Sequence, residues 1–256
     1  PVRFVKSATA PTRMTEDTVP DPRLLLLSNS MMPGQGYLAW ARPHISDFLG
    51  PGVRRVFFVP FAGVTKPWDE YTQAVRGVFG ALGYEVVGAH EHDDPAAALA
   101  DSDAVAVGGG NTFQLLAQMY GTGLIGAIRR TALDGMPYIG WSAGANVACP
   151  TIRTTNDMPI VEPPGLSALG LVPFQINAHY TEARLGDHGG ETRVDRLNEF
   201  VHANPGMPVV GLPEGTALRL EGDELSLIGE AEAVVYGLEG GPRRVDAGGL
   251  KKLGLL

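Results

Sequence analysis

Cysteine and basic residues are both scarce in this sequence. Cys149 is the single cysteine among 256 residues, so no disulfide can form within the chain. A core that holds without disulfides is typical of a reducing compartment, and we expect a cytoplasmic location. The 20 lysines and arginines are outnumbered by 28 acidic residues, giving a formal net charge of −8. Because no basic stripe is available to neutralise phosphates, we expect neither nucleic acid nor an anionic membrane as a partner.

Long apolar runs are also missing. No uncharged stretch is long enough to span a bilayer, and residues 1–22 contain no apolar segment of the kind found in signal peptides. Residues 1–22 are polar, contain Pro11, Pro20 and Pro22 besides the first residue Pro1, and show no periodicity, so we predict a flexible leader. The chain is 44% hydrophobic, enough for a sizeable core, and we expect residues 23–256 to form a single α/β domain.

Short apolar runs alternate with helical segments in the first part of the chain. Strands are predicted at 24–27, 53–59, 84–87, 104–107 and 138–140, with helices between them at 37–49, 68–82, 95–101, 112–120 and 124–133. Continuous apolar strands separated by helices indicate a mostly parallel sheet covered on both faces. The predicted fold class is therefore a doubly wound α/β fold.

The pattern changes beyond residue 150. Strands are predicted at 171–176 and 207–212, with a helix at 191–203 between them. Three further short strands, at 217–220, 225–228 and 233–236, predict a small C-terminal antiparallel meander. We interpret this meander as structural cover.

Polar or glycine-rich turns follow several of the predicted strands. They lie at 28–30, 61–65, 108–111 and Ser142. In open α/β sheets, ligands bind at the carboxyl ends of the strands. The sequence therefore places a candidate site on that rim of the sheet.

The pentapeptide from Gly140 to Gly144 has the pattern Gly-x-Ser-x-Gly and lies between a predicted strand and a run of small residues. This combination is typical of a nucleophile elbow, which lifts a serine hydroxyl into solvent beside backbone N–H donors. The flanking glycines remove Cβ atoms that would collide in so sharp a turn. Such a site suits acyl transfer with Ser142 as nucleophile, although a plain tight turn could have the same local sequence.

A serine nucleophile needs a base to accept its proton. His179 follows the end of a predicted strand, whereas His188 lies in a glycine-rich loop. We favour His179 because a base needs a rigid mount, and keep His188 as the alternative. The other histidines are interpreted as structural or solvated: His44, His90, His92 and His202.

Several carboxylates beyond Ser142 could orient that base. The candidates are Asp157, Glu162, Asp187, Glu191 and Glu214. Glu214 lies between Pro213 and Gly215, in a turn at a strand end, and Asp157 lies in a polar loop. The residues alone do not separate these two.

The run from Gly108 to Asn111 lacks the glycine spacing and the following Lys-Ser/Thr of phosphate-binding loops. We interpret it as an oxyanion donor, in which the N–H of Gly109 or Gly110 acts together with that of Ala143. Asn111 is a candidate substrate contact. The sequence contains no Cys/His cluster and no His-Glu-x-x-His pattern, so we expect neither a metal nor a cofactor.

Longer motifs surround these residues. They are the leucine run with its Ser-Asn-Ser at 24–30, Pro-Phe-Ala-Gly-Val-Thr at 60–65, Trp-Asp-Glu-Tyr at 68–71, and the segments 107–116 and 140–163. Over residues 24–220 the chain resembles the peptidase E family of α-aspartyl dipeptidases. The resemblance implies a flavodoxin-like fold similar to that of class I glutamine amidotransferases, with serine in place of their cysteine. It also implies hydrolysis of dipeptides that begin with aspartate.

The resemblance decides the choices left open above. The family's nucleophile falls on Ser142, its histidine on His179 and its acid on Glu214. Ala178 stands where the family usually has a proline before the histidine, yet we expect the base to keep its role.

Substrate-binding candidates also follow from the resemblance. The family's arginine for the substrate aspartate falls on Arg193, with Arg153 as second choice, and Asp157 matches an acid near the site that could face the α-ammonium. The expected partner is a small dipeptide, and a homodimer is compatible with the sequence. Two other functions stay open: a cyanophycinase-like hydrolase of β-aspartyl-arginine, and a non-catalytic ligand-binding protein of the same fold.

Overall fold

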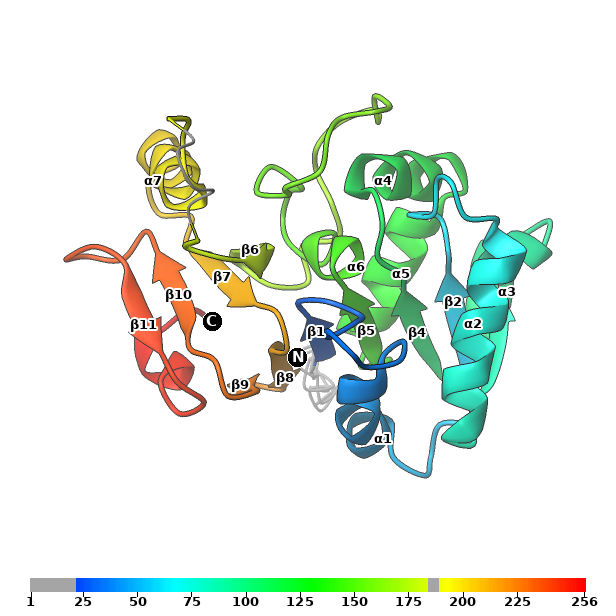
Figure 1. Cartoon of the computed structure of the whole chain (residues 1–256). Coiled ribbons are helices and arrows are strands. Elements are labelled where there is room, and N and C mark those ends of the chain that lie inside the picture. Colours follow the sequence, from blue (N-terminus) through cyan, green and yellow to red (C-terminus); the bar gives the residue numbers. More distant parts are fainter. Residues whose placement is uncertain (1–21, 184–188) are drawn as a thin grey trace, which may run out of the picture.

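A computed structural model of the chain describes residues 22–183 and 189–256. All but the last residue of the expected leader, and the alternative base His188, lie outside the described residues. Two sheets and the helices around them organise the described part of the chain (Figure 1).

The larger sheet has seven strands in the order β3-β2-β4-β5-β1-β8-β9. Its members are β1 (Arg23–Leu27), β2 (Arg55–Val59), β3 (Glu85–Gly88), β4 (Ala104–Val107), β5 (Tyr138–Trp141), β8 (Ala217–Glu221) and β9 (Glu224–Ile228). The first five pair with one another in parallel, whereas β8 pairs with β1 and β9 pairs with β8 in antiparallel fashion. The doubly wound, mostly parallel sheet predicted from the alternation is thus confirmed.

Alternate residues of the parallel strands point into two hydrophobic clusters, one on each face. Leu24 and Leu26 of β1 join one cluster, and Leu25 and Leu27 join the other. The first face is covered by α3 (Pro95–Ala100), α4 (Thr112–Gly121), α5 (Leu124–Leu133) and α6 (Ala143–Asn146). The second is covered by α1 (Arg42–Leu49) and α2 (Trp68–Ala81). Strands buried on both faces explain the continuous apolar runs of the sequence.

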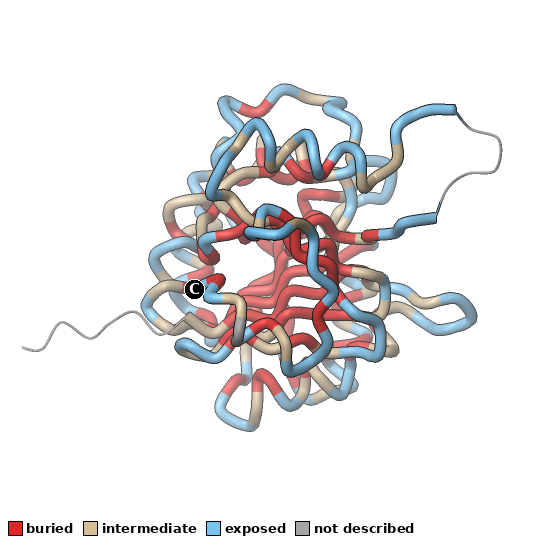
Figure 2. Tube along the Cα trace, turned by 90° about the vertical axis from the view of Figure 1, so that its left-hand side faces the viewer, coloured by how far each residue is buried: buried red, intermediate tan, exposed pale blue. Residues whose placement is uncertain are grey.

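The smaller sheet has four strands in the order β11-β10-β7-β6. They are β6 (Gln175–Tyr180), β7 (Val209–Pro213), β10 (Ala233–Tyr236) and β11 (Arg243–Val245), and β6 and β7 are parallel. One face, with Val210, joins the cluster that also holds Leu24 of the larger sheet. The other face, with Val209, packs against α7 (Arg193–Ala203). Both sheets therefore share one core, and the buried stretches gather at the centre of the molecule (Figure 2).

The expected C-terminal meander needs correction. The segments 217–220 and 225–228 form β8 and β9 at the edge of the larger sheet, whereas 233–236 forms β10 beside β7. The strand predicted at 171–176 begins at Gln175 instead. Turn sequences indicate where strands end. Which strands pair with each other depends on contacts between residues that are distant in the sequence. Short 3₁₀ helices complete the chain: η1 (Ala39–Ala41), η2 (Ala89–Glu91) and η3 (Leu250–Leu253).

Candidate active site

Ser142 lies at the carboxyl end of β5, immediately before α6. Its backbone has φ 52° and ψ −110°, a conformation that is uncommon for a residue with a side chain. The flanking glycines are required by close contacts, because a Cβ on Gly140 would lie 2.3 Å from the Gly144 carbonyl oxygen and one on Gly144 would lie 2.1 Å from the Val107 carbonyl oxygen. The strand, turn and helix of the predicted elbow are all present.

His179 lies in a bulge of β6. Ala178 pairs with Leu212 and Tyr180 with Pro213, so His179 is an extra residue in the ladder with β7. Its φ is 52°, and its backbone N–H donates to the hydroxyl oxygen of Ser28 at 2.9 Å. Bulges redirect side chains in this way near functional sites.

The three candidate catalytic side chains form a continuous hydrogen-bonded chain. His179 Nε2 lies 3.0 Å from Ser142 Oγ, and His179 Nδ1 lies 2.7 Å from Glu214 Oε1. A neutral imidazole that donates from Nδ1 to the carboxylate leaves Nε2 as the acceptor for the serine hydroxyl. This is the arrangement a base needs to take a proton from a serine. Glu214 therefore contacts the base, as the resemblance implied.

The turn that carries Glu214 is tied to the end of β1. The Gly215 N–H donates to Asn29 Oδ1 at 2.9 Å, and the hydroxyl of the preceding Ser28 donates to the Leu212 carbonyl at 2.7 Å. The residues that follow β1 thus contact both the bulge that carries His179 and the turn that carries Glu214. Neither Ser28 nor Asn29 was predicted as a site residue. The polar Ser-Asn-Ser sequence directly after a run of leucines is the pattern from which they could have been predicted.

The glycine loop after β4 packs against Ser142. A Cβ on Gly109 would lie 3.1 Å from Ser142 Cβ. Gly110 has φ 138°, and a Cβ there would lie 2.2 Å from the Ala62 carbonyl oxygen. Within the described parts of the chain, the Gly110 and Ala143 amides donate to no protein acceptor. Both are therefore available to a negatively charged oxygen formed next to Ser142.

Asp157 holds the start of α4. Its Oδ2 accepts from the Thr112 N–H at 2.8 Å, from the Thr112 hydroxyl at 2.5 Å and from the Thr155 hydroxyl at 3.1 Å. Asn111 caps the same helix, since its Oδ1 accepts from the Gln114 N–H at 3.0 Å, and its Nδ2 donates to the Met158 carbonyl at 2.9 Å. Both predicted substrate contacts thus support the segment that follows Gly110.

The two candidate arginines have different surroundings. Arg193, half-buried at the start of α7, donates to Asn177 Oδ1 at 3.3 Å, and burial followed by the nearby Arg196 lowers its guanidinium pKa. Among the described residues, no carboxylate lies within ion-pair distance of Arg193. Arg153 is exposed, donates to Asn204 Oδ1 at 2.8 Å and stacks over the Phe200 ring. Of the two, Arg193 is the more buried, and its hydrogen-bond partner Asn177 is neutral.

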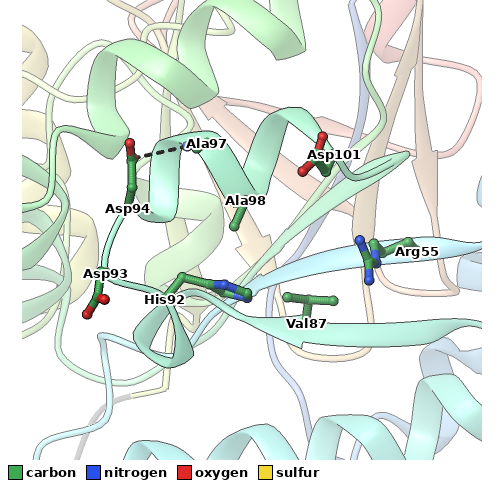
Figure 3. A pocket seen from close by; sticks show the side chains of 8 residues that line it. All are labelled: Arg55, Val87, His92, Asp93, Asp94, Ala97, Ala98 and Asp101. Atoms are coloured by element: carbon green, nitrogen blue, oxygen red, sulfur yellow. Dashed lines mark hydrogen bonds between the residues drawn. The ribbon is translucent and has the colours of Figure 1, made fainter.

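Two other polar clusters lie on the β3 side of the larger sheet. A hollow of about 320 Å³ between β2, β3 and α3 is lined by Arg55, His92 and three aspartates, of which Asp94 caps α3 (Figure 3). Asp69, His90 and Glu91 could bring three metal-ligand atoms within 4.8 Å of one another, but Arg76 already pairs with Glu91. Strand β3 is separated from β5 by β2 and β4, so neither cluster belongs to the site at Ser142.

Comparison with known proteins gives the family of the chain. Residues 24–228 match the model of peptidase family S51. The chain belongs to peptidase family S51. This S51 chain is 51% identical to a peptidase E of Nostoc sp. over 84% of its own length and 88% of that protein. It is 50% identical to a peptidase E of Citrobacter koseri over 83% of its length and 93% of that protein.

A solved structure shares the fold of this S51 peptidase. The crystal structure of a peptidase from an acI-B1 actinobacterium superposes with a TM-score of 0.67 at 18% identity, covering 90% of the present chain and 96% of that one. S51 is a family of serine peptidases, so the chain is a hydrolase that acts on peptides. In the described residues, no helix has the length and apolar character needed to cross a membrane. The cytoplasmic location stays a prediction.

Proposed function

We propose that the chain hydrolyses dipeptides that begin with aspartate, with Ser142 as nucleophile, His179 as base and Glu214 as the acid that orients it. The single observation that carries the chemical part is the chain of contacts from Ser142 Oγ through both ring nitrogens of His179 to Glu214 Oε1. The resemblance and the names of the relatives from Nostoc sp. and Citrobacter koseri support the dipeptidase part.

Acylation begins when Ser142 Oγ attacks the carbonyl carbon of the aspartyl residue and its proton passes to His179 Nε2. Glu214 stabilises the imidazolium that forms, because its carboxylate lies 2.7 Å from Nδ1. The N–H groups of Ala143 and Gly110 receive the oxyanion. The C–N bond then breaks, the leaving amine takes the proton from His179, and an aspartyl ester of Ser142 remains.

Deacylation repeats these steps with water. His179 takes a proton from the attacking water, and the resulting hydroxide adds to the ester carbonyl. The second oxyanion occupies the same pair of amides. When the ester C–O bond breaks, Ser142 recovers the proton from His179 and free aspartate leaves.

Selection of aspartate is assigned to Arg193. Its guanidinium is half-buried and its hydrogen-bond partner Asn177 is neutral, so it can gain a charge-assisted contact when a β-carboxylate arrives. Asparagine has the same shape without the charge. The site should therefore prefer Asp-Leu to Asn-Leu by roughly 10³-fold in kcat/KM.

The test is a peptide panel assayed with wild type and Ser142→Ala. Asp-Leu, Asn-Leu, Glu-Leu, β-Asp-Arg and Ala-Leu are compared by release of the free amino acid. We expect turnover of Asp-Leu alone or in large excess, and none by Ser142→Ala. Faster turnover of β-Asp-Arg would favour the cyanophycinase-like activity, and binding of Asp-Leu without turnover would favour a non-catalytic protein.

A further inference from the structure

Tyr71, on α2, makes three contacts just beneath the nucleophile. Its hydroxyl lies 3.0 Å from the Gly109 carbonyl oxygen, 3.0 Å from Trp141 Nε1 and 3.2 Å from the Tyr37 hydroxyl. Trp141 is the residue before Ser142, and Gly109 belongs to the glycine loop that packs against Ser142. One buried hydroxyl therefore connects both parts of the backbone that supply the oxyanion donors.

The directions of these hydrogen bonds follow from the chemistry of the groups. An indole N–H can only donate, so Trp141 donates to Tyr71, and a carbonyl can only accept, so the Tyr71 hydrogen goes to Gly109. Since that hydrogen is used, Tyr37 must donate to Tyr71. Burial raises the pKa of both tyrosines, which keeps each hydroxyl protonated at any ordinary pH.

The Gly109 carbonyl and the Gly110 N–H belong to one planar peptide group. The described residues contain no cis peptide bond, and in a trans peptide the C=O and the N–H point in opposite directions. A carbonyl held toward Tyr71 therefore turns the Gly110 N–H away from Tyr71. That N–H has no protein acceptor among the described residues.

Glycines on both sides make this peptide plane easy to rotate. Glycine adopts positive φ without steric cost, and Gly110 is at φ 138°. Turning this plane over would present a carbonyl oxygen where an N–H is needed. Glycine at position 108 also leaves space for the Tyr71 side chain, because a Cβ there would lie 2.7 Å from the Tyr71 hydroxyl.

We propose that Tyr71 is a positioning residue of the oxyanion hole: its hydroxyl holds the Gly109–Gly110 peptide with the Gly110 N–H facing the reacting carbonyl. The inference rests on the proposed serine mechanism and deepens it. Tyr71 touches neither substrate nor the reacting atoms. It acts through a peptide plane whose orientation matters only once negative charge develops on the substrate oxygen.

The experiment compares Tyr71→Phe with Tyr37→Phe. Both changes remove one buried hydroxyl from the same cluster, but only Tyr71→Phe releases the Gly109 carbonyl. With Asp-Leu we expect Tyr71→Phe to lower kcat roughly 10- to 10³-fold, the range for an oxyanion donor that is lost in part or in full, while KM changes less than about threefold. Tyr37→Phe should keep kcat within about threefold of wild type.

A second measurement does not depend on the substrate. A fluorophosphonate probe forms a bond between phosphorus and Ser142 Oγ with loss of fluoride, and its phosphoryl oxygen occupies the oxyanion hole. The rate of labelling, followed by mass spectrometry, should fall in Tyr71→Phe and stay near wild type in Tyr37→Phe, with Ser142→Ala unlabelled. Thermal unfolding and circular dichroism check that both tyrosine variants are folded.

The outcomes separate the inference from the proposed function. If wild type labels but does not cleave Asp-Leu, the dipeptidase proposal fails while the labelling rates still test Tyr71. If both tyrosine variants lose activity equally, the cluster has a structural role only and the inference is overturned. The inference would also be overturned if Tyr71→Phe raised KM for Asp-Leu and left kcat unchanged. Such a change reports weaker substrate binding, whereas a damaged oxyanion hole lowers kcat. Should Tyr71→Phe be unfolded, Gly109→Ala, whose added Cβ would lie 3.1 Å from Ser142 Cβ, must slow labelling in a folded protein or the inference fails.

Discussion

The backbone N–H of His179 donates a hydrogen bond to the hydroxyl of Ser28, a residue 151 positions away in the chain. The same hydroxyl donates to the Leu212 carbonyl, two residues before Glu214. Ser28 thus joins the end of β1 to the bulge that carries His179 and to the strand that leads to Glu214. The positive φ of His179 is held by this contact and by the ladder with β7.

Ser28→Ala should weaken catalysis through the base. The change leaves the His179 N–H and the Leu212 carbonyl without their partner, at a cost of about 1–3 kcal/mol in the free energy of unfolding. A looser imidazole should lower kcat roughly tenfold. The control is Ser30→Ala in the same turn, whose hydroxyl bonds to none of the described residues. Equal kcat values in the two variants would show that Ser28 does not position His179.

Glu214→Gln should keep the shape of the side chain and remove the charge that stabilises the His179 imidazolium. We expect kcat to fall on the order of 10²-fold or more with little change in KM. Glu162→Gln is the matched control, because Glu162 is an exposed carboxylate in the loop beyond the elbow. Steady-state kinetics with Asp-Leu measure both. A Glu214→Gln variant with kcat within tenfold of wild type would assign the orienting role elsewhere.

Asp157→Ala should disturb the start of α4, next to the oxyanion loop. The Thr112 N–H and hydroxyl both lose their acceptor, so we expect a lower melting temperature together with a lower kcat. Asp157→Asn keeps an oxygen acceptor and should recover part of both losses. If Asp157→Asn instead raised KM for Asp-Leu and left the melting temperature unchanged, the carboxylate would contact the substrate ammonium as the sequence first indicated.

Arg193→Met should remove most of the preference for aspartate. The half-buried guanidinium is expected to bind the substrate β-carboxylate. Its loss should therefore strongly lower kcat/KM for Asp-Leu, while the value for Asn-Leu changes little. The control is Arg196→Met on the same helix, because the Arg196 side chain is 70% exposed. A preference that survives in Arg193→Met would transfer recognition to Arg153 or to backbone donors.

Cys149 should be inert in the folded protein. Burial raises the pKa of its thiol to about 12, so only roughly 10⁻⁴ of it is thiolate at pH 8. We expect negligible alkylation by iodoacetamide at pH 8 in the native state and rapid alkylation in guanidinium chloride. Fast native alkylation at pH 8 would contradict the burial of this residue.

Local sequence was sufficient for the elements that depend on near neighbours. The glycines around Ser142 predict a sharp turn. In the structure, a Cβ atom at Gly140 or Gly144 would collide with a backbone carbonyl group, so both positions require glycine. Apolar runs of four or five residues between helical segments announced a sheet buried on both faces. The position of Glu214 between Pro213 and Gly215 indicated a turn at a strand end, and the turn follows β7.

The sequence did not predict which strands pair with each other. The short strands near the C-terminus look alike, yet β8 and β9 extend the larger sheet and β10 joins the smaller one. The residues around His179 do not predict a bulge. The bulge is defined by how β6 pairs with β7, and that pairing cannot be seen in the local sequence. Asp157 was expected at the substrate, and its contacts with Thr112 could not be read from residues 45 positions apart.

The sequence by itself determined the nucleophile elbow, the alternation of strands and helices and the absence of disulfides, because these follow from steric freedom, periodicity and composition. Only the tertiary structure decided which residues support the site: Ser28 beneath His179, Asn29 beneath the Glu214 turn and Tyr71 beneath Gly109. Each of these contacts joins the ends of segments that are distant in the chain. A hydrogen bond between such segments depends on how whole elements pack, and packing is a property of the folded chain rather than of any local stretch.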